Sequence, residues 1–120
     1  QTDEAGTVGA ASALMVTGTG GADALSGGSG NDLFVGGTGA DTFSFAGAFG
    51  QDIVADFAAT GAAHDVIGFQ AGSSLNSFAA VMDRTAQVGT GVVISQDGFN
   101  AVTLLGVTKN SLGADNFSFV

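Results

Sequence analysis

The stretch that decides the fold consists of three contiguous nonapeptides, GTGGADALS at residues 18–26, GGSGNDLFV at 27–35 and GGTGADTFS at 36–44. Each has Gly at its first and fourth positions, Asp at its sixth and a large apolar residue at its eighth. After an insertion of two residues, GAFGQDIVA at residues 47–55 follows the same pattern. A period this regular is typical of a repeat architecture.

The chemistry of one unit predicts its shape. Glycine at the first, second and fourth positions permits positive φ angles and close approach of the backbone, so the first six residues are expected to form a turn. The last three suit a short strand whose middle side chain points inward. Successive turns alternate between two sides, which places Leu25 and Phe43 in one sheet and Phe34 and Val54 in the facing sheet. We therefore predict an all-β fold, a two-layered roll of parallel strands.

Apolar burial alone is too small to hold this roll. Fixing one backbone residue costs roughly 1–2 kcal/mol, whereas each large buried side chain returns only about 1.5–3 kcal/mol. Charge adds to the difficulty, because a run of aspartates precedes the first basic residue, Arg84. The aspartates are Asp23, Asp32, Asp41, Asp52, Asp56 and Asp65.

Turns on the same side of the roll recur after two units, so Asp23 is expected to face Asp41, and Asp32 to face Asp52. Like charges stacked in this way require a cation between them. Carboxylates and the carbonyls of glycine-rich turns are hard oxygen ligands, which favour Ca²⁺ over Mg²⁺. A zinc site is not expected, because the chain has no Cys and one His. Aspartate also favours turns by bonding its own backbone, but four aspartates in register favour ligation, whereas Asp3, Glu4, Asp83 and Asp97 are expected to be surface or turn residues.

The units resemble the Gly-Gly-x-Gly-x-Asp-x-apolar-x repeat of RTX proteins, which form a calcium-bound parallel β-roll. The resemblance covers about residues 18–120 and implies two or three Ca²⁺ ions, each held by turn carbonyls and aspartates from two turns on one side. One implied site takes Thr19, Gly21 and Asp23 with Gly36, Thr38 and Asp41. A second takes Gly28, Gly30 and Asp32 with Gly47, Phe49 and Asp52. A third would lie between Gly37, Gly39, Asp41 and a carboxylate from Asp56 or Asp65.

We expect three segments within one domain. Residues 1–17 form an N-terminal cap or a linker from an upstream part, residues 18–55 form the roll, and residues 56–120 form a C-terminal capping region. In that last region, Asp56-Phe57 and residues 65–69 are expected to form irregular strands.

The C-terminal region also predicts one short helix and a hairpin. The helix lies within residues 77–87, with Ser74 or Asn76 as N-cap and Gly89 as its stop. An antiparallel hairpin of residues 91–95 and 101–105, turning at Asp97-Gly98, would close the roll.

Composition excludes several classes of function. The net charge of −9 argues against nucleic acid and anionic membranes, and no apolar run is long enough to insert into a membrane. His64 is the only histidine, and no nucleophile or oxyanion motif accompanies it, so we expect no enzyme activity. The chain looks like a piece of a longer protein whose upstream domain is a candidate secreted hydrolase.

The final Asp115-x-Phe117-x-Phe119 pattern resembles the end of RTX proteins exported by type I secretion, where the transporter recognises the C-terminal region. The resemblance implies a domain secreted by a Gram-negative bacterium, unfolded in calcium-poor cytoplasm and folded by calcium outside. The alternative is a calcium-dependent module that binds polysaccharide or another surface. Small outward residues favour it, but the absence of Trp and Tyr argues against sugar stacking.

Overall fold

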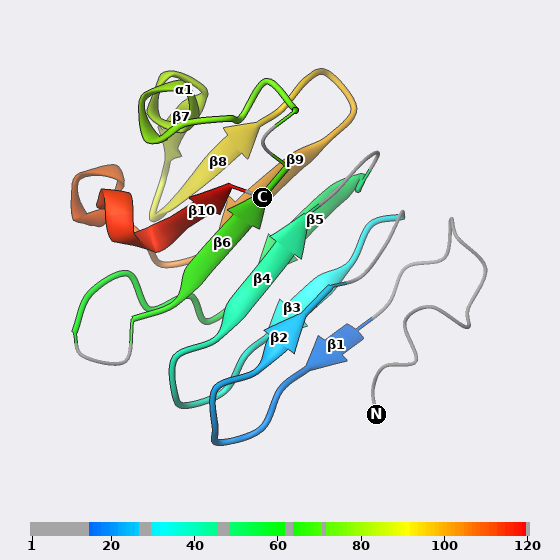
Figure 1. Ribbon diagram of the computed structural model, residues 1–120, viewed down its shortest axis with the longest axis vertical. Helices are drawn as coiled ribbons and strands as arrows, with labels where there is room; N and C mark the ends of the chain where they lie inside the picture. Colours follow the sequence, from blue (N-terminus) through cyan, green and yellow to red (C-terminus); the bar gives the residue numbers. More distant parts are fainter. Residues whose placement is uncertain (1–14, 27–29, 46–48, 62–63, 71, 120) are drawn as a thin grey trace.

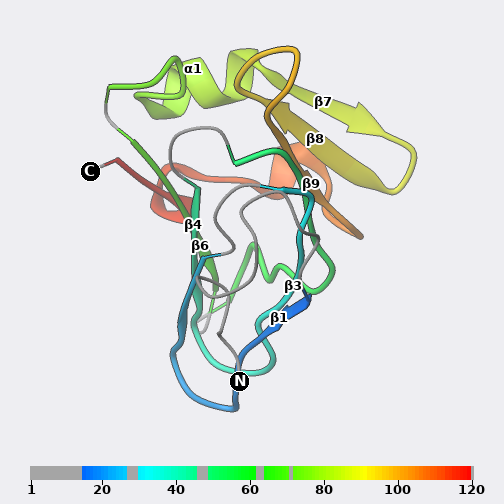
Figure 2. The same ribbon diagram turned by 90° about the vertical axis from the view of Figure 1, so that its right-hand side faces the viewer.

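The structure is a computed structural model, and it describes residues 15–26, 30–45, 49–61, 64–70 and 72–119. These residues form two facing sheets with one helix at the end (Figures 1 and 2). The six-stranded sheet has the order β1 (Met15–Thr17), β3 (Leu33–Val35), β5 (Gln51–Val54), β9 (Ala101–Leu104), β8 (Gly91–Ser95), β7 (Thr85–Val88). The four-stranded sheet has the order β10 (Phe117–Phe119), β6 (Val66–Phe69), β4 (Thr42–Phe45), β2 (Ala24–Leu25).

Successive strands of the repeat alternate between the two sheets, as the nine-residue period predicts. Leu25 pairs in register with Phe43 in the four-stranded sheet, and Phe34 pairs with Val54 in the six-stranded sheet. All pairings among β1, β3, β5 and β9 are parallel, as are all those in the four-stranded sheet. Figure 2 shows β4 and β6 on one side of the molecule and β1, β3 and β9 on the other. The fold is a parallel β-roll.

The repeat extends one strand further toward the N-terminus. Val16 is buried and pairs with Phe34, so β1 is an additional strand of the roll. The rest of the predicted N-terminal cap, residues 1–14, lies outside the described residues.

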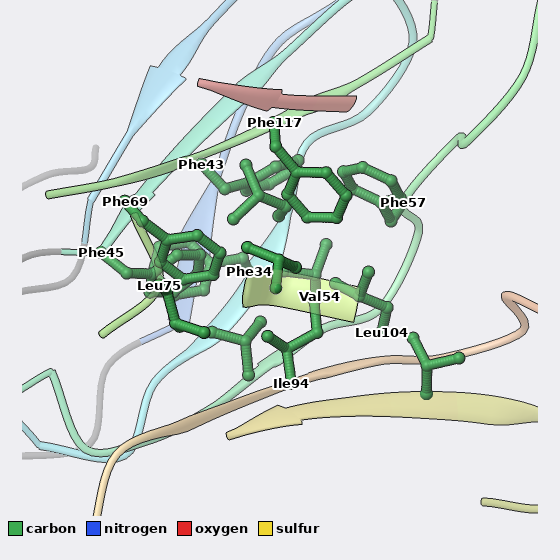
Figure 3. Close-up of a cluster of buried hydrophobic side chains, with 14 of the residues drawn as sticks. Phe34, Phe43, Phe45, Val54, Phe57, Phe69, Leu75, Ile94, Leu104 and Phe117 are labelled. Atoms are coloured by element: carbon green, nitrogen blue, oxygen red, sulfur yellow. The ribbon is translucent and has the colours of Figure 1, made fainter. Parts of the chain in front are cut away.

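The core lies between the sheets and is richer in aromatic side chains than the repeat alone predicts. The insertion places Phe45 at the end of β4, where its ring lies 5.3 Å from those of both Phe34 and Phe49. Phe69 continues this cluster to Phe117, with which it stacks at 6.4 Å. In Figure 3 the rings of Phe45 and Phe69, from the four-stranded sheet, lie close to side chains of the opposite sheet, Val54, Ile94 and Leu104. This one cluster joins side chains of the repeat to side chains of the C-terminal region, and its burial stabilises both.

The C-terminal region departs from prediction in two places. Residues 66–69 form a regular parallel strand, β6, whereas Asp56 and Phe57 lie in a turn, because Asp56 is held by backbone N–H groups of a repeat turn. The helix α1 (Phe78–Asp83) is capped by Ser77, whose Oγ accepts a hydrogen bond from the N–H of Ala80.

The helix also ends well before Gly89. Its following residues form β7, which pairs antiparallel with β8, since the β-branched Thr85 and Val88 suit a strand. Strands β8 and β9 form the predicted antiparallel pair on either side of Asp97 and Gly98. Short 3₁₀ helices, η2 (Lys109–Ser111) and η3 (Ala114–Asn116), lead into β10.

Candidate metal-binding turns

Three aspartates stack along the edge of the four-stranded sheet. The N–H of Asp23 donates to Oδ1 of Asp41 at 2.9 Å, and the N–H of Asp41 donates to Oδ1 of Asp65 at 2.8 Å. The pattern repeats because each aspartate directly precedes a strand of the same sheet, β2, β4 or β6. We call this set, Asp23, Asp41 and Asp65, the Asp41 stack.

A second set lies on the other side of the roll. The N–H of Asp32 donates to Oδ1 of Asp52 at 2.7 Å; Asp32 directly precedes β3 and Asp52 is the second residue of β5, both in the six-stranded sheet. We call Asp32 and Asp52 the Asp52 stack. The structure thus brings together both pairs of aspartates that the sequence places opposite one another.

In both stacks one carboxylate oxygen is left over. The side chains of Asp41 and Asp52 are 1% and 2% exposed, and Oδ2 of each is buried with no hydrogen-bond partner among the described residues. A buried anionic oxygen without a partner is costly. Desolvation by burial raises the pKa of Asp41, and the charges of Asp65 and Asp23 raise it further. Burial likewise raises the pKa of Asp52 to about 7, with the charge of Asp32 adding to it.

The turn carbonyls face the next turn on the same side. A Cβ on Gly37 would lie 2.5 Å from the carbonyl oxygen of Thr19, and a Cβ on Gly39 would lie 2.7 Å from that of Gly21. The carbonyl of Gly30 approaches Gly50 in the same manner. Glycine at these positions therefore allows carbonyl oxygens from one turn to lie against the next.

Four residues of the implied sites need separate description. Gly28 and Gly47 lie outside the described residues. The side chain of Phe49 is buried in the core, so only its main chain is available to a ligand. Thr38 uses its hydroxyl to contact the carbonyl of Gly20 at 3.3 Å.

The first turn closes on itself. The N–H of Thr19 donates to Oδ2 of Asp23 at 2.7 Å, and the Thr19 hydroxyl donates to Oδ1 at 3.0 Å. Gly37, the equivalent of Thr19 in the third unit, has a φ of +83°, whereas none of the described residues other than glycine has a positive φ. Both oxygens of Asp23 therefore accept hydrogen bonds within its own turn, and the first turn differs in backbone conformation from the third.

The two alternatives for a third site are both present at the turn of residues 36–41. Asp56 accepts from the N–H groups of Gly36 and Gly37 at 2.9 and 2.8 Å. Asp65 accepts from Asp41 and, through its other oxygen, from the N–H of Ala58 at 2.8 Å. Both carboxylates are thus hydrogen-bonded to backbone, one at each end of the turn.

Within the described part of the chain, no three side chains of Asp, Glu, His or Cys gather around one point. Among the outlying acids, Asp83 is exposed, and Asp97 bonds the N–H groups of Phe99 and Asn100 in its own loop. These bonds lower the pKa of Asp97. Asp3 and Glu4 lie outside the described residues.

Two asparagines at the ends of the stacks were not anticipated from the sequence. The side chain of Asn100 accepts a hydrogen bond from the N–H of Gly50 at 2.9 Å, and the amide of Asn116 donates to the carbonyl of Asp65 at 3.0 Å. A sequence signal existed for Asn116, because GADNFSF at residues 113–119 differs from GADTFSF at 39–45 at one position only.

Comparison with solved structures supports the fold. A segment of the extracellular lipase LipA from Serratia marcescens matches 88% of this chain with a TM-score of 0.62 and 23% identity. The AlgE6R3 subunit of the Azotobacter vinelandii mannuronan C5-epimerase matches 92% of this chain and 80% of its own, with a TM-score of 0.40 and 26% identity. No protein-family model matches the chain, and no curated protein does.

The chain spans 21% of the length of that lipase. In the described part of the chain, no helix is both long and apolar enough to cross a membrane. The match to a small part of a larger protein, together with the two-sheet architecture, shows that the chain shares its β-roll fold with a segment of that lipase.

Proposed function

We propose that this chain is a calcium-binding module of a secreted protein and that it folds when calcium binds. The observation that carries the proposal is the leftover oxygen in each stack. Oδ2 of Asp41 and of Asp52 is buried without a hydrogen-bond partner among the described residues, while Oδ1 is fixed by the preceding turn.

The residues fit Ca²⁺ in their chemistry. Every candidate ligand is an oxygen, and carboxylates are combined with carbonyls that face the neighbouring turn. When bound, Ca²⁺ supplies positive charge and about six to eight coordination positions for oxygen. The residues proposed to hold it are Thr19, Gly21, Asp23, Gly36, Thr38 and Asp41 on one side, and Gly28, Gly30, Asp32, Gly47, Phe49 and Asp52 on the other.

A third ion is proposed at the turn of residues 36–41. Gly37, Gly39 and Asp41 would hold it with Asp65, which contacts Asp41, or with Asp56, which contacts Gly37. Both carboxylates already accept hydrogen bonds from backbone, so this site is the one that requires the most rearrangement.

Coupling of folding to calcium follows from the repulsion within the stacks. Without a cation the chain must either bury adjacent carboxylates or protonate them, and both options reduce the stability of the folded roll. Binding to the folded state alone adds its free energy to folding. Extracellular modules bind calcium at about 10⁻⁴–10⁻³ M, so the chain would be unfolded in calcium-poor cytoplasm and folded outside the cell.

Export is the part of the proposal that rests on the RTX resemblance. The C-terminal region would be recognised by a type I secretion transporter before the chain folds, and an upstream domain of the parent protein would be exported with it. In the folded chain, Phe117 is buried against Phe69 and Phe78. Its recognition by a transporter would therefore precede folding.

One observation favours a surface-binding module as a second candidate. A row of six residues crosses the outer face of the six-stranded sheet in register and carries no charge. The row consists of Met15, Leu33, Ile53, Thr103, Val93 and Ala86. An uncharged row on so acidic a chain suits contact with another surface, and calorimetry against glycans in calcium tests the polysaccharide version directly.

The deciding experiment is a titration of the chain with Ca²⁺, and with Mg²⁺ as control, followed by far-ultraviolet circular dichroism and heat of binding. A calcium-selective transition from coil to β structure is expected. A chain that is equally folded in calcium and in metal-depleted buffer would contradict the proposal.

A further inference from the structure

A buried asparagine lies next to each stack of carboxylates. Asn116 is 0% exposed, and its side chain donates to the carbonyl of Asp65 at the end of the Asp41 stack. Asn100 is 7% exposed, and its side chain accepts from the N–H of Gly50, two residues before Asp52. Among the described residues, Asn100 and Asn116 are the asparagines and glutamines with buried side chains. The other buried polar side chains there are those of Thr85 and of the stacked aspartates Asp32, Asp41, Asp52 and Asp65.

The position of Asn116 is informative because its segment resembles a repeat unit both in sequence and in its place in the sheet. GADTFSF at residues 39–45 and GADNFSF at 113–119 differ only where Thr42 is replaced by Asn116. Strands β4 and β10 flank β6 in the same register, with Phe43 and Phe117 both paired with Ile67. By this alignment Asp115 would be the next aspartate of the Asp41 stack.

The structure turns Asp115 away from the stack instead. Its side chain is 75% exposed, and its Oδ2 lies 3.7 Å from Nε2 of His64. The 3₁₀ helix η3 rotates the backbone before β10, and this rotation points Asn116 inward. The stack therefore continues with an amide where the repeat alone would place a carboxylate.

The amide of Asn116 completes the hydrogen bonding at this level. The carbonyls of Asp23 and Asp41 accept from the backbone N–H groups of Thr42 and Val66. At the next level, Nδ2 of Asn116 donates to the carbonyl of Asp65 and to that of Ala59, both at 3.0 Å.

Its amide oxygen is used as well. Oδ1 of Asn116 accepts from the N–H of Gly113 at 2.8 Å, so the side chain joins the segments that carry residues 59, 65 and 113. A carboxylate there would face two carbonyl oxygens next to the charge of Asp65.

On the other side of the roll, both the oxygen and the nitrogen of the Asn100 side chain are also hydrogen-bonded. Its Oδ1 accepts from the N–H of Gly50, and its Nδ2 donates to both oxygens of Asp97 at 3.0 Å. In the third turn, the N–H groups of Gly36 and Gly37 are instead bound by a carboxylate, that of Asp56.

We propose that Asn116 and Asn100 are neutral terminators, which end the two stacks of carboxylates so that the last level needs no cation. The proposal rests on the proposed function, because it concerns where the calcium-dependent part of the chain stops. It makes both asparagines positioning residues and not ligands.

The test compares calcium titrations of the wild-type chain with those of Asn116→Asp, Asn116→Ala and Asn110→Asp. Asn110 is exposed in η2 and lies outside the stacks, so its variant adds the same charge without the same surroundings. Asn116→Asp is expected to raise the calcium concentration at the folding midpoint by about tenfold, a shift of about 1.4 kcal/mol, and to add one calcium ion per folding event. Asn116→Ala should raise the midpoint without changing the ion count, and Asn110→Asp should change neither. Equal behaviour of Asn116→Asp and Asn110→Asp would overturn the proposal.

A second measurement keeps the test decisive if Asn116→Asp does not fold. In the wild-type chain, the side-chain amide protons of Asn116 are expected to exchange with solvent much more slowly than those of Asn110 by nuclear magnetic resonance. Equal exchange would overturn the role of Asn116. A wild-type chain that folds without calcium would contradict the proposed function, yet this comparison of the two amides would still decide whether Asn116 closes the stack.

Discussion

The repeat region, residues 15–55, and the C-terminal region, residues 64–119, both bury phenylalanines but differ in their buried polar groups. The repeat region buries Asp32, Asp41 and Asp52. In the C-terminal region the buried polar side chains are hydrogen-bonded, as when the hydroxyl of Thr85 donates to the carbonyl of Val81 at 2.7 Å. Asp65, at the boundary, has both of its oxygens bound by backbone N–H groups.

The difference teaches that the two regions depend on different forces. The C-terminal region has a helix and an antiparallel strand pair, and it shares one apolar core with the repeat region, so its stability should depend on cations less than that of the repeat region. The repeat region has strands of two to four residues and buried carboxylates close to one another, so its stability should depend directly on a cation. Substitutions in the repeat region should therefore respond to calcium more strongly than those in the C-terminal region.

The largest effect is expected from truncating one core side chain in each region. Phe34→Ala removes a ring that meets those of Phe43 and Phe45, and should cost about 3–5 kcal/mol in calcium. Ile94→Ala should cost about 2–5 kcal/mol. Chemical denaturation with and without calcium measures the free energy of unfolding that each of the two variants loses.

In metal-depleted buffer, Ile94→Ala should still reduce the residual structure, whereas Phe34→Ala should leave it unchanged, because the repeat region is then already unfolded. Comparable losses for both variants in metal-depleted buffer would contradict the division into two regions.

A second prediction uses pH to act on the repeat region alone. Because burial raises the pKa of Asp52 from 3.8 to about 7, the metal-free folded state binds a proton that the unfolded state releases. Without calcium, the repeat region should therefore be most stable below about pH 4 and lose stability as the pH rises through 7.

Calcium binding should show the opposite dependence, since the ion requires the deprotonated carboxylate. Its affinity should fall about tenfold between pH 8 and pH 6, as one group with a pKa near 7 is protonated. Calorimetry at the two pH values measures this. Asp52→Asn should weaken the pH dependence, and an unchanged affinity in the wild-type chain would show that Asp52 does not titrate with calcium.

The sequence predicts the repeat region better than the C-terminal region, for a physical reason. A fixed period determines which side chains share a sheet, so the pairing of Leu25 with Phe43 and the contact of Asp23 with Asp41 follow from spacing alone. The ends of α1 depend instead on competition between helix and strand, and Thr85 joins β7 because β8 lies beside it. The role of Asn116 depends on a backbone rotation at η3 that spacing does not encode.

A third prediction tests the close approach of neighbouring turns in the repeat region. Gly37 and Gly61 have similar φ values, +83° and +95°, but a Cβ on Gly37 would lie 2.5 Å from the carbonyl of Thr19, whereas no atom lies within 4 Å of one on Gly61 among the described residues. Both alanine variants should lose about 1 kcal/mol from backbone strain.

Gly37→Ala should lose more, roughly 1–3 kcal/mol in total, because the carbonyl of Thr19 must move away. It should also weaken calcium binding, which thermal unfolding in calcium and calorimetry would report together. If the two variants have the same stability and affinity, the contact between turns does not position ligands.

The smallest effect belongs to the helix cap of the C-terminal region. Ser77→Ala removes the hydrogen bond that the Ser77 hydroxyl accepts from the N–H of Ala80, and should cost about 1 kcal/mol. Asn76→Ala is the matched control, since Asn76 is the neighbouring residue, one of the two that the sequence offered as cap, and it is exposed. Its effect on stability should be close to zero.

Because α1 packs through Val81 on the apolar core and not on the stacks, the loss of stability caused by Ser77→Ala should be the same at all calcium concentrations at which the C-terminal region is folded. A loss that grows as calcium is removed would mean that the two regions fold as one unit, and the contrast between them would then describe their chemistry but not their stability.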